Sequence, residues 1–245
     1  MLPILQFKTF YMTEFRPGRF ELIPPVIKNL LIVNVLVFFA QKIFENNASF
    51  NIEHLFALHD VRSVYFKPHQ LITHLFMHGG IDHIFFNMFA LWMFGSILEN
   101  LWGPKRFLIF YMACGLGAAV LHIATLYVEL TPIYDAFKSL PISQQEQYLY
   151  ADNFKLNTAT LGASGAVFGC LAAFGYLFPN SLIYLYFFLP VKAKWFVLFY
   201  GAMELWLGIR NSAGDNVAHW AHLGGALVGL ILVWYWNKTN RRNFY

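Results

Sequence analysis

Charged residues are scarce in this chain of 245 amino acids. Asp, Glu, Lys and Arg make up 12% of it, against about 25% in ordinary soluble domains. Hydrophobic residues reach 58%, and the mean hydropathy is +0.49. This composition excludes an ordinary soluble domain and indicates a bilayer protein. The net charge of +4 is small, and no basic cluster has base-stacking aromatics in a polar setting, which argues against nucleic-acid binding.

Cysteine is also rare. Cys114 and Cys170 both lie inside apolar runs, and no CxxC pair occurs. A disulfide framework and a cysteine-based redox or metal motif are therefore not expected. The first 25 residues carry charges but no apolar core of signal-peptide type. We therefore expect the first hydrophobic span to be retained as an uncleaved anchor.

Apolar segments dominate what is present. Six of them approach the roughly 20 residues that cross a bilayer. They predict an all-α polytopic membrane protein, built as a bundle of six transmembrane helices. The segments are residues 26–44, 81–101, 107–128, 161–177, 193–209 and 217–236.

The basic residues predict an orientation. Those in the short connections and near the termini fall on one side if both termini are cytoplasmic, as the positive-inside rule favours. We then expect a cytosolic lead-in over 1–25, a membrane domain over 26–237 and a cytosolic tail over 238–245. The expected location is a bacterial inner (plasma) membrane. The polar connections 45–80 and 129–160 would face outward.

A serine stands at the head of the fourth segment, within Gly162-Ala163-Ser164-Gly165. The small neighbours let another backbone approach its hydroxyl. A helix that begins here offers unpaired N–H groups and a positive dipole end, which favour a developing oxyanion. Gly165 and Gly169 also form a small-xxx-small pair, which is more typical of a helix-packing face. The segment alone therefore favours packing over catalysis.

The sixth segment opens with two histidines, His219 and His222, spaced so that they lie roughly on one helix face. Gly225 and Gly229 follow as a second small-xxx-small pair. If this face packs on the glycine face of the fourth segment, a histidine meets Ser164. A neutral imidazole is the usual base for a serine nucleophile.

Other polar residues lie inside apolar segments, where they are functional-site hypotheses by default. His83 and Asn87 are four residues apart and could donate to an oxyanion, or could brace neighbouring helices. Glu99 is interpreted as a structural hydrogen-bonding group near the following turn. Glu204 could be a brace or a protonated carboxyl. Since no acidic residue is an obvious third member of a triad, a Ser–His dyad is the simplest scheme.

A metal site is the weaker interpretation of the many histidines. The sequence contains no HExxH, and no Cys or carboxylate completes a plausible zinc set. We therefore expect neither a metal nor a cofactor. The histidines considered are His74, His78, His83, His219 and His222.

Together these motifs resemble the rhomboid family of intramembrane serine proteases. The similarity runs from about Thr73 to Gly229. It is carried by Gly162-x-Ser164-Gly165, Ala221-His222-x-x-Gly225-x-x-x-Gly229 and His78-x-x-x-x-His83-x-x-x-Asn87.

The resemblance implies a six-helix bundle with a water-accessible cavity open to the outer side. Ser164 would be the nucleophile and His222 the general base. His83 and Asn87 would help the Ser164 backbone N–H to form the oxyanion hole. The chain would cleave single-span membrane-protein substrates in or near their transmembrane segment.

Further roles follow from the same resemblance. Phe168 would pack on the catalytic imidazole, His78 would bond within the interfacial loop, and His219 would be an additional histidine and a rival base. Bulky residues of the fifth segment could form a lateral gate for the substrate. These are Trp195, Phe196, Phe199, Tyr200 and Trp206.

The sequence departs from the family pattern at two places. His69-Gln70 stand where many members carry a Trp-Arg pair, and the connection 129–160 is long. The competing hypothesis is a non-catalytic protein, either a client-binding pseudoprotease or a small-solute membrane transporter. Degenerate relatives of this kind lack the serine or the histidine, and this chain retains both.

Overall fold

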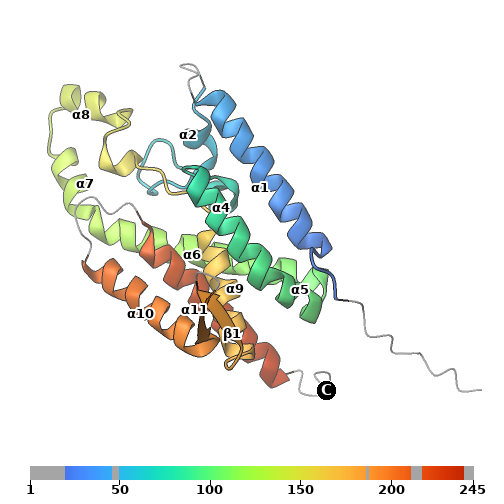
Figure 1. Cartoon of the computed structure of the whole chain (residues 1–245). Helices are drawn as coiled ribbons and strands as arrows, with labels where there is room; N and C mark the ends of the chain where they lie inside the picture. The colour runs from blue at the N-terminus through green and yellow to red at the C-terminus, as the bar shows by residue number, and fades with distance from the viewer. Residues whose placement is uncertain (1–19, 46–49, 186–187, 211–216, 240–245) are drawn as a thin grey trace, which may run out of the picture.

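The computed structural model describes residues 20–45, 50–185, 188–210 and 217–239, and this part of the chain is mostly helical (Figure 1). Most of the predicted lead-in and tail, residues 1–19 and 240–245, lies outside the described residues. The α-helices are α1 (Pro25–Phe44), α2 (Ile52–Phe56), α3 (Gln70–Thr73), α4 (Ile81–Ala90), α5 (Ser96–Trp102), α6 (Pro104–Glu129), α7 (Thr131–Lys138), α8 (Ile142–Leu149), α9 (Ser164–Leu177), α10 (Ala193–Arg210) and α11 (His219–Thr239). The remaining elements are η1 (His74–Phe76), η2 (Leu91–Gly95), η3 (Lys155–Asn157), β1 (Leu182–Leu185) and β2 (Leu189–Lys192).

Each of the six apolar segments coincides with helix. Among the described residues, three helices are long and apolar enough to cross a membrane by length and composition: α1, the continuous helix Ile81–Trp102 and α6. The middle one contains a π-helical stretch, η2, between α4 and α5. Helix α9 is apolar but shorter, at 14 residues.

Helix α9 lies at the centre of the helical layers, between α6, α10 and α11 (Figure 1). Ten of its fourteen residues are buried. Many of these are Gly or Ala, whose small side chains permit close helix packing. Large aromatic residues of α6, including Phe107, Phe110 and Tyr111, fill the core beside it. The fold therefore places the start of α9 where side chains from several helices can reach it.

The contact between α9 and α11 is made by glycines. A Cβ added to Gly225 would collide with the carbonyl oxygen of Gly165, and one added to Gly229 would lie 2.8 Å from the carbonyl oxygen of Gly169. The two backbones are therefore in direct contact at both levels. This is the packing that the two small-xxx-small pairs predicted.

Glu99 ties the start of α1 to the end of α5. Its two carboxylate oxygens accept hydrogen bonds from the backbone N–H groups of Val26 and Ile27, each at 2.8 Å. The first N–H groups of a helix have no partner within the helix, so this carboxylate caps α1. The predicted structural role fits this contact, but the partner is α1 rather than the turn after α5.

The structure corrects the all-α prediction in one place. After α9, strands β1 and β2 form an antiparallel hairpin, with Leu182 opposite Lys192 and Leu185 opposite Leu189. Pro179 lies two residues after the end of α9, and Pro190 could not continue a helix because it lacks an N–H group. The connection 129–160, whose structure the sequence left open, contains α7, α8 and η3.

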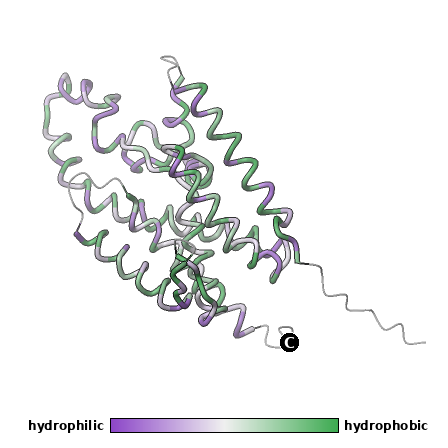
Figure 2. Tube along the Cα trace, viewed as in Figure 1, coloured by the Kyte–Doolittle hydropathy of each residue, from purple (hydrophilic) through white to green (hydrophobic). Residues whose placement is uncertain are grey.

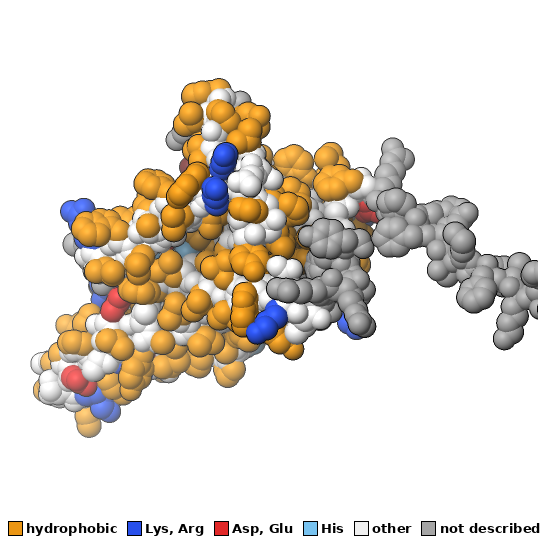
Figure 3. Space-filling model, turned by 90° about the horizontal axis from the view of Figure 1, so that it is seen from below, with side chains coloured by type: hydrophobic (Ala, Val, Ile, Leu, Met, Phe, Trp, Pro, Cys, Tyr) orange, Lys and Arg blue, Asp and Glu red, His pale blue; other side chains and the backbone are white. Residues whose placement is uncertain are grey.

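The surface fits a lipid environment. Hydrophobic side chains cover most of the face seen in Figure 3. Several large hydrophobic residues of α1 are exposed, among them Leu36, Phe39 and Ile43. Figure 2 shows hydrophilic residues gathered in the α7–α8 segment at one end of the molecule. An apolar surface of this extent is unfavourable in water and is expected in contact with acyl chains.

We expect Gly225→Ala to lower the unfolding temperature of the purified protein in detergent, because the new methyl group must separate α9 from α11. Overpacking of this kind costs about 1–3 kcal/mol. Differential scanning fluorimetry measures the shift. The matched control is Gly201→Ala in α10, where an added Cβ meets no atom within 4 Å. Equal melting of the two variants would contradict the packing described.

Candidate active site

Ser164 is the first residue of α9 and follows a turn that only glycine makes easily. Gly162 has φ of +136°, and its N–H donates to the carbonyl oxygen of His74 at 3.0 Å. A Cβ on Gly162 would lie 2.8 Å from Nε2 of His83 and 3.6 Å from Oγ of Ser164. The absent side chain therefore leaves room for the His83 ring close to the serine.

The structure brings His222 and Ser164 together. His222 Nε2 lies 2.8 Å from Ser164 Oγ, a hydrogen-bond distance. The two residues are 58 positions apart in the sequence. Ser164 directly precedes Gly165 on α9, and His222 lies one turn before Gly225 on α11, so both are next to the facing glycines. The imidazole thus sits where it could take the proton of the serine hydroxyl.

The imidazole plane of His222 is fixed by aromatic stacking. The Phe168 ring lies parallel to it, with centroids 4.2 Å apart and an interplanar angle of 4°. Tyr200 of α10 also stacks on the Phe168 ring, with centroids 5.2 Å apart. This arrangement leaves the imidazole little freedom to rotate away from Ser164.

Glu204 of α10 makes the contact that sequence reasoning missed. Its Oε2 accepts hydrogen bonds from Nδ1 of His222 at 2.9 Å and from Nδ1 of His219 at 2.7 Å. The sequence offered no obvious third member beside the serine and the histidine, yet a carboxylate lies on the far side of the imidazole. The available signal was an acidic residue inside an apolar segment.

The same contacts correct the expectation that no carboxylate accompanies the histidines. Glu204, His219 and His222 each offer a ligand atom, and these atoms lie within 4.8 Å of one another. The three side chains therefore form a group that could hold a metal ion by composition. His74, His78 and His83 are not part of it.

The two residues expected to donate to the oxyanion, His83 and Asn87, make different hydrogen bonds. His83 stands beside Gly162, and its Nδ1 accepts a hydrogen bond from the N–H of Gly79 at 3.3 Å. Asn87 uses its amide to donate to the carbonyl oxygen of His83 at 3.0 Å, within its own helix. An amide group carries two N–H hydrogens. One of those of Asn87 bonds within α4, and this bond does not use the second.

The main chain of His78 helps to hold the loop before α4. Its backbone N–H donates to Gln41 Oε1 at 2.9 Å, and its carbonyl oxygen accepts from Gln41 Nε2 at 3.2 Å. The loop is thus tied to α1 through the main chain of His78. The His78 ring packs edge-on against His83, with centroids 5.2 Å apart.

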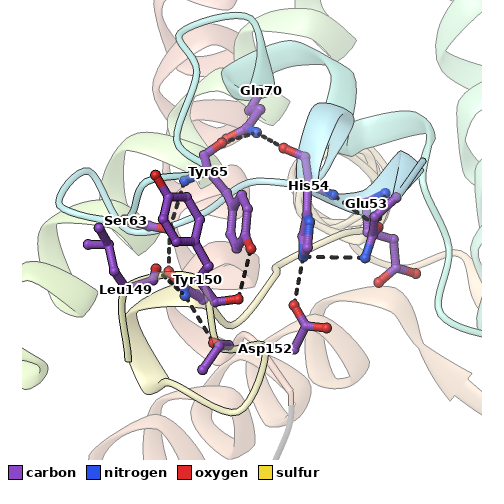
Figure 4. Close-up of polar contacts among 11 residues, drawn as sticks. Glu53, His54, Ser63, Tyr65, Gln70, Leu149, Tyr150 and Asp152 are labelled. Carbon is purple, nitrogen blue, oxygen red and sulfur yellow. Dashed lines mark hydrogen bonds and ion pairs between the residues drawn. The ribbon is translucent and has the colours of Figure 1, made fainter. Parts of the chain in front are cut away.

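Gln70 supplies bracing at the position where the family often has arginine. Its amide nitrogen donates to the carbonyl oxygens of His54 and Tyr65, at 3.0 and 2.8 Å (Figure 4). Its Oε1 accepts from the N–H of Lys67. The neighbouring His69 bonds the carbonyl oxygen of Leu55 at 2.7 Å. The replaced pair still ties the loop together.

The connection 129–160 clasps this same loop (Figure 4). His54 contacts Asp152 at 3.0 Å, and the Tyr65 hydroxyl donates to the Tyr150 carbonyl oxygen at 3.0 Å. Ser63 donates to Asn157 Oδ1 at 2.7 Å. The long connection therefore has a structural role in holding the loop that precedes the candidate site.

Comparison with known proteins decides the family. The model of the Rhomboid domain matches residues 65–239, which include the serine, both oxyanion candidates and the histidine pair. The chain belongs to the rhomboid family. This is an integral membrane family that includes serine intramembrane proteases.

Several rhomboid proteins resemble this chain. RHOMBOID-like protein 12, mitochondrial, of Arabidopsis thaliana is 30% identical over 220 residues, 89% of this chain and 60% of that protein. Rhomboid protease GluP of Bacillus subtilis is 29% identical over 80% of this chain and 32% of its own length. Rhomboid protease AarA of Providencia stuartii is 25% identical over 83% of this chain and 69% of its own length.

The buried loop residue His74 predicts that the stability of the protein depends on pH. Burial lowers the pKa of His74 from 6.5 to about 4, although its Nδ1–H bonds the Gln70 carbonyl oxygen. The unfolded chain therefore binds more protons between these pH values, and stability falls as the pH is lowered from about 7 towards 4. We expect the unfolding temperature to fall over this range.

The variant His74→Asn keeps a donor near the position of Nδ1 but does not titrate. Its unfolding temperature should fall less steeply with decreasing pH than that of the wild type, as measured by scanning fluorimetry across a pH series. Parallel curves for the two proteins would show that His74 is not the titrating group.

Proposed function

We propose that this rhomboid protein is an intramembrane serine endopeptidase, with Ser164 as nucleophile and His222 as general base. The observation that carries the proposal is the 2.8 Å separation of Ser164 Oγ and His222 Nε2. The Phe168 ring supports it, because it holds the imidazole in the plane of that hydrogen bond. Two of the relatives, GluP and AarA, are named rhomboid proteases.

The reaction is acyl transfer. Ser164 Oγ attacks the carbonyl carbon of the scissile peptide bond while its proton passes to His222 Nε2. The backbone N–H of Ser164 at the start of α9, together with His83 and Asn87, donates to the oxyanion. His222 then protonates the leaving amine, and a water molecule activated by the same imidazole releases the acyl group.

The length of α9 supports the membrane arrangement that we propose. At 1.5 Å per residue, a helix of 14 residues rises about 21 Å, less than the roughly 30 Å of the hydrocarbon core. With both termini cytoplasmic, Ser164 then lies below the outer surface. The proposal places the six helices of the domain 26–237 around a water-accessible outward cavity, because hydrolysis needs water that the bilayer lacks. The bacterial inner membrane stays a prediction, since relatives are also mitochondrial and chloroplastic.

Helix α10 is the proposed entry side for single-span membrane-protein substrates. Trp195, Phe199 and Trp206 project from it, with exposed fractions of 58%, 70% and 65%. Phe196 and Tyr200 stack on one another and, through Phe168, reach the imidazole. A substrate helix that passed these residues would meet Ser164 once it unwound locally.

The test is cleavage of a single-span reporter by purified protein in proteoliposomes, followed on gels. We expect Ser164→Ala and His222→Ala to abolish cleavage, because each removes a group that the acyl transfer needs. The control Ser181→Ala, in the exposed turn before the β-hairpin, should cleave like the wild type. Unchanged cleavage by Ser164→Ala would reject the assignment, and a wild type that binds the reporter intact would favour a pseudoprotease.

A further inference from the structure

We propose that Glu204 is a positioning residue for His222 and that the chain works through a Ser164–His222–Glu204 triad rather than a dyad. The inference rests on the proposed function and adds a member to it. It begins from a contact between helices: Glu204 lies on α10, whereas both of its histidine partners lie on α11.

The two hydrogen bonds of His222 are on opposite sides of its ring. Nε2 faces Ser164 Oγ at 2.8 Å, and Nδ1 faces Glu204 Oε2 at 2.9 Å. A neutral imidazole carries one hydrogen, on one of these nitrogens. An ionised carboxylate can only accept, so it holds the hydrogen on Nδ1. Nε2 is thereby left with the lone pair that must take the serine proton.

The surroundings keep the carboxylate in place. The side chain of Glu204 is only 5% exposed, and a buried charge is costly unless it is paired and hydrogen-bonded. His219 supplies a second donor to the same oxygen at 2.7 Å, from one turn before His222. Two imidazole N–H groups thus orient one carboxylate oxygen. The negative charge of this carboxylate would stabilise the imidazolium that forms when His222 takes the proton of Ser164.

The distances distinguish this arrangement from a metal site. Tetrahedral zinc with bonds of 2.0–2.1 Å keeps its ligand atoms about 3.3 Å apart. Glu204 Oε2 lies 2.7 and 2.9 Å from the two Nδ1 atoms, which are charge-assisted hydrogen-bond lengths. The geometry therefore fits two N–H donors on a carboxylate.

The test compares Glu204→Gln with Glu99→Gln in the reporter assay. Both residues are buried acids, but Glu99 caps α1 and touches neither Ser164 nor His222. We expect Glu204→Gln to lower kcat at least tenfold with KM within twofold of wild type, because the charge opposite the imidazole is lost. Loss of the triad aspartate costs soluble serine proteases roughly 10⁴-fold. Glu99→Gln should lower the unfolding temperature and keep kcat per folded molecule.

A third variant, Glu204→Asp, keeps the charge and should recover part of the lost kcat. This rescue separates positioning from a purely structural role, and it remains measurable if Glu204→Gln fails to fold. Wild-type kcat in Glu204→Gln, with Ser164→Ala and His222→Ala inactive, would overturn the triad and leave the dyad. Cleavage by Ser164→Ala would instead reject the proposed function itself.

A chelation experiment tests whether the same three side chains bind a metal instead. Cleavage by the wild type should be unaffected by EDTA, as hydrogen bonding predicts. Loss of activity in EDTA, restored by zinc in the wild type and not in Glu204→Gln, would assign the same three side chains to a metal and overturn the proposal.

Discussion

Direct backbone contact between α9 and α11 is the constraint on which the rest of the site depends. Gly165 and Gly169 face Gly225 and Gly229 so closely that no side chain fits between them. Helices are stiff, so a contact fixed at two levels also fixes the residues next to it. Ser164 directly precedes Gly165, His222 lies one turn before Gly225, and their side chains are 2.8 Å apart. The packing interpretation of these glycines and the catalytic one are therefore not rivals, because the first creates the geometry for the second.

Buried polar side chains in an apolar helix bundle need hydrogen-bond partners, and here they provide them for one another in a chain of hydrogen bonds. Ser164, His222, Glu204 and His219 form consecutive hydrogen bonds across three helices. Glu204, His219 and His222 are buried, and a buried polar side chain that lost its hydrogen-bond partner would cost roughly 1–3 kcal/mol. Such a chain of hydrogen bonds is expected where it serves a function, and the aromatic ring of Phe168 stacks on the His222 imidazole within it.

Much of the site could be predicted from the sequence because it depends on spacing within single helices. The i,i+4 pair His83 and Asn87 and the glycine pairs are visible in this way. Glu204 could not be assigned, because its partners are 15 and 18 residues away on another helix. Helix α10 carries apolar residues on all sides, so periodicity does not fix its rotation. The β-hairpin and the clasp of the 129–160 connection escaped prediction because they depend on contacts between distant segments.

The most direct test of the central claim is chemical. A serine-reactive fluorophosphonate is added to the folded protein in detergent, and the modified peptide is mapped by mass spectrometry. The account predicts one adduct, on Ser164, formed at a rate that collapses in His222→Ala while Ser181 stays unmodified. An adduct on a different serine, or equal labelling of Ser164 with and without the His222 imidazole, would contradict it.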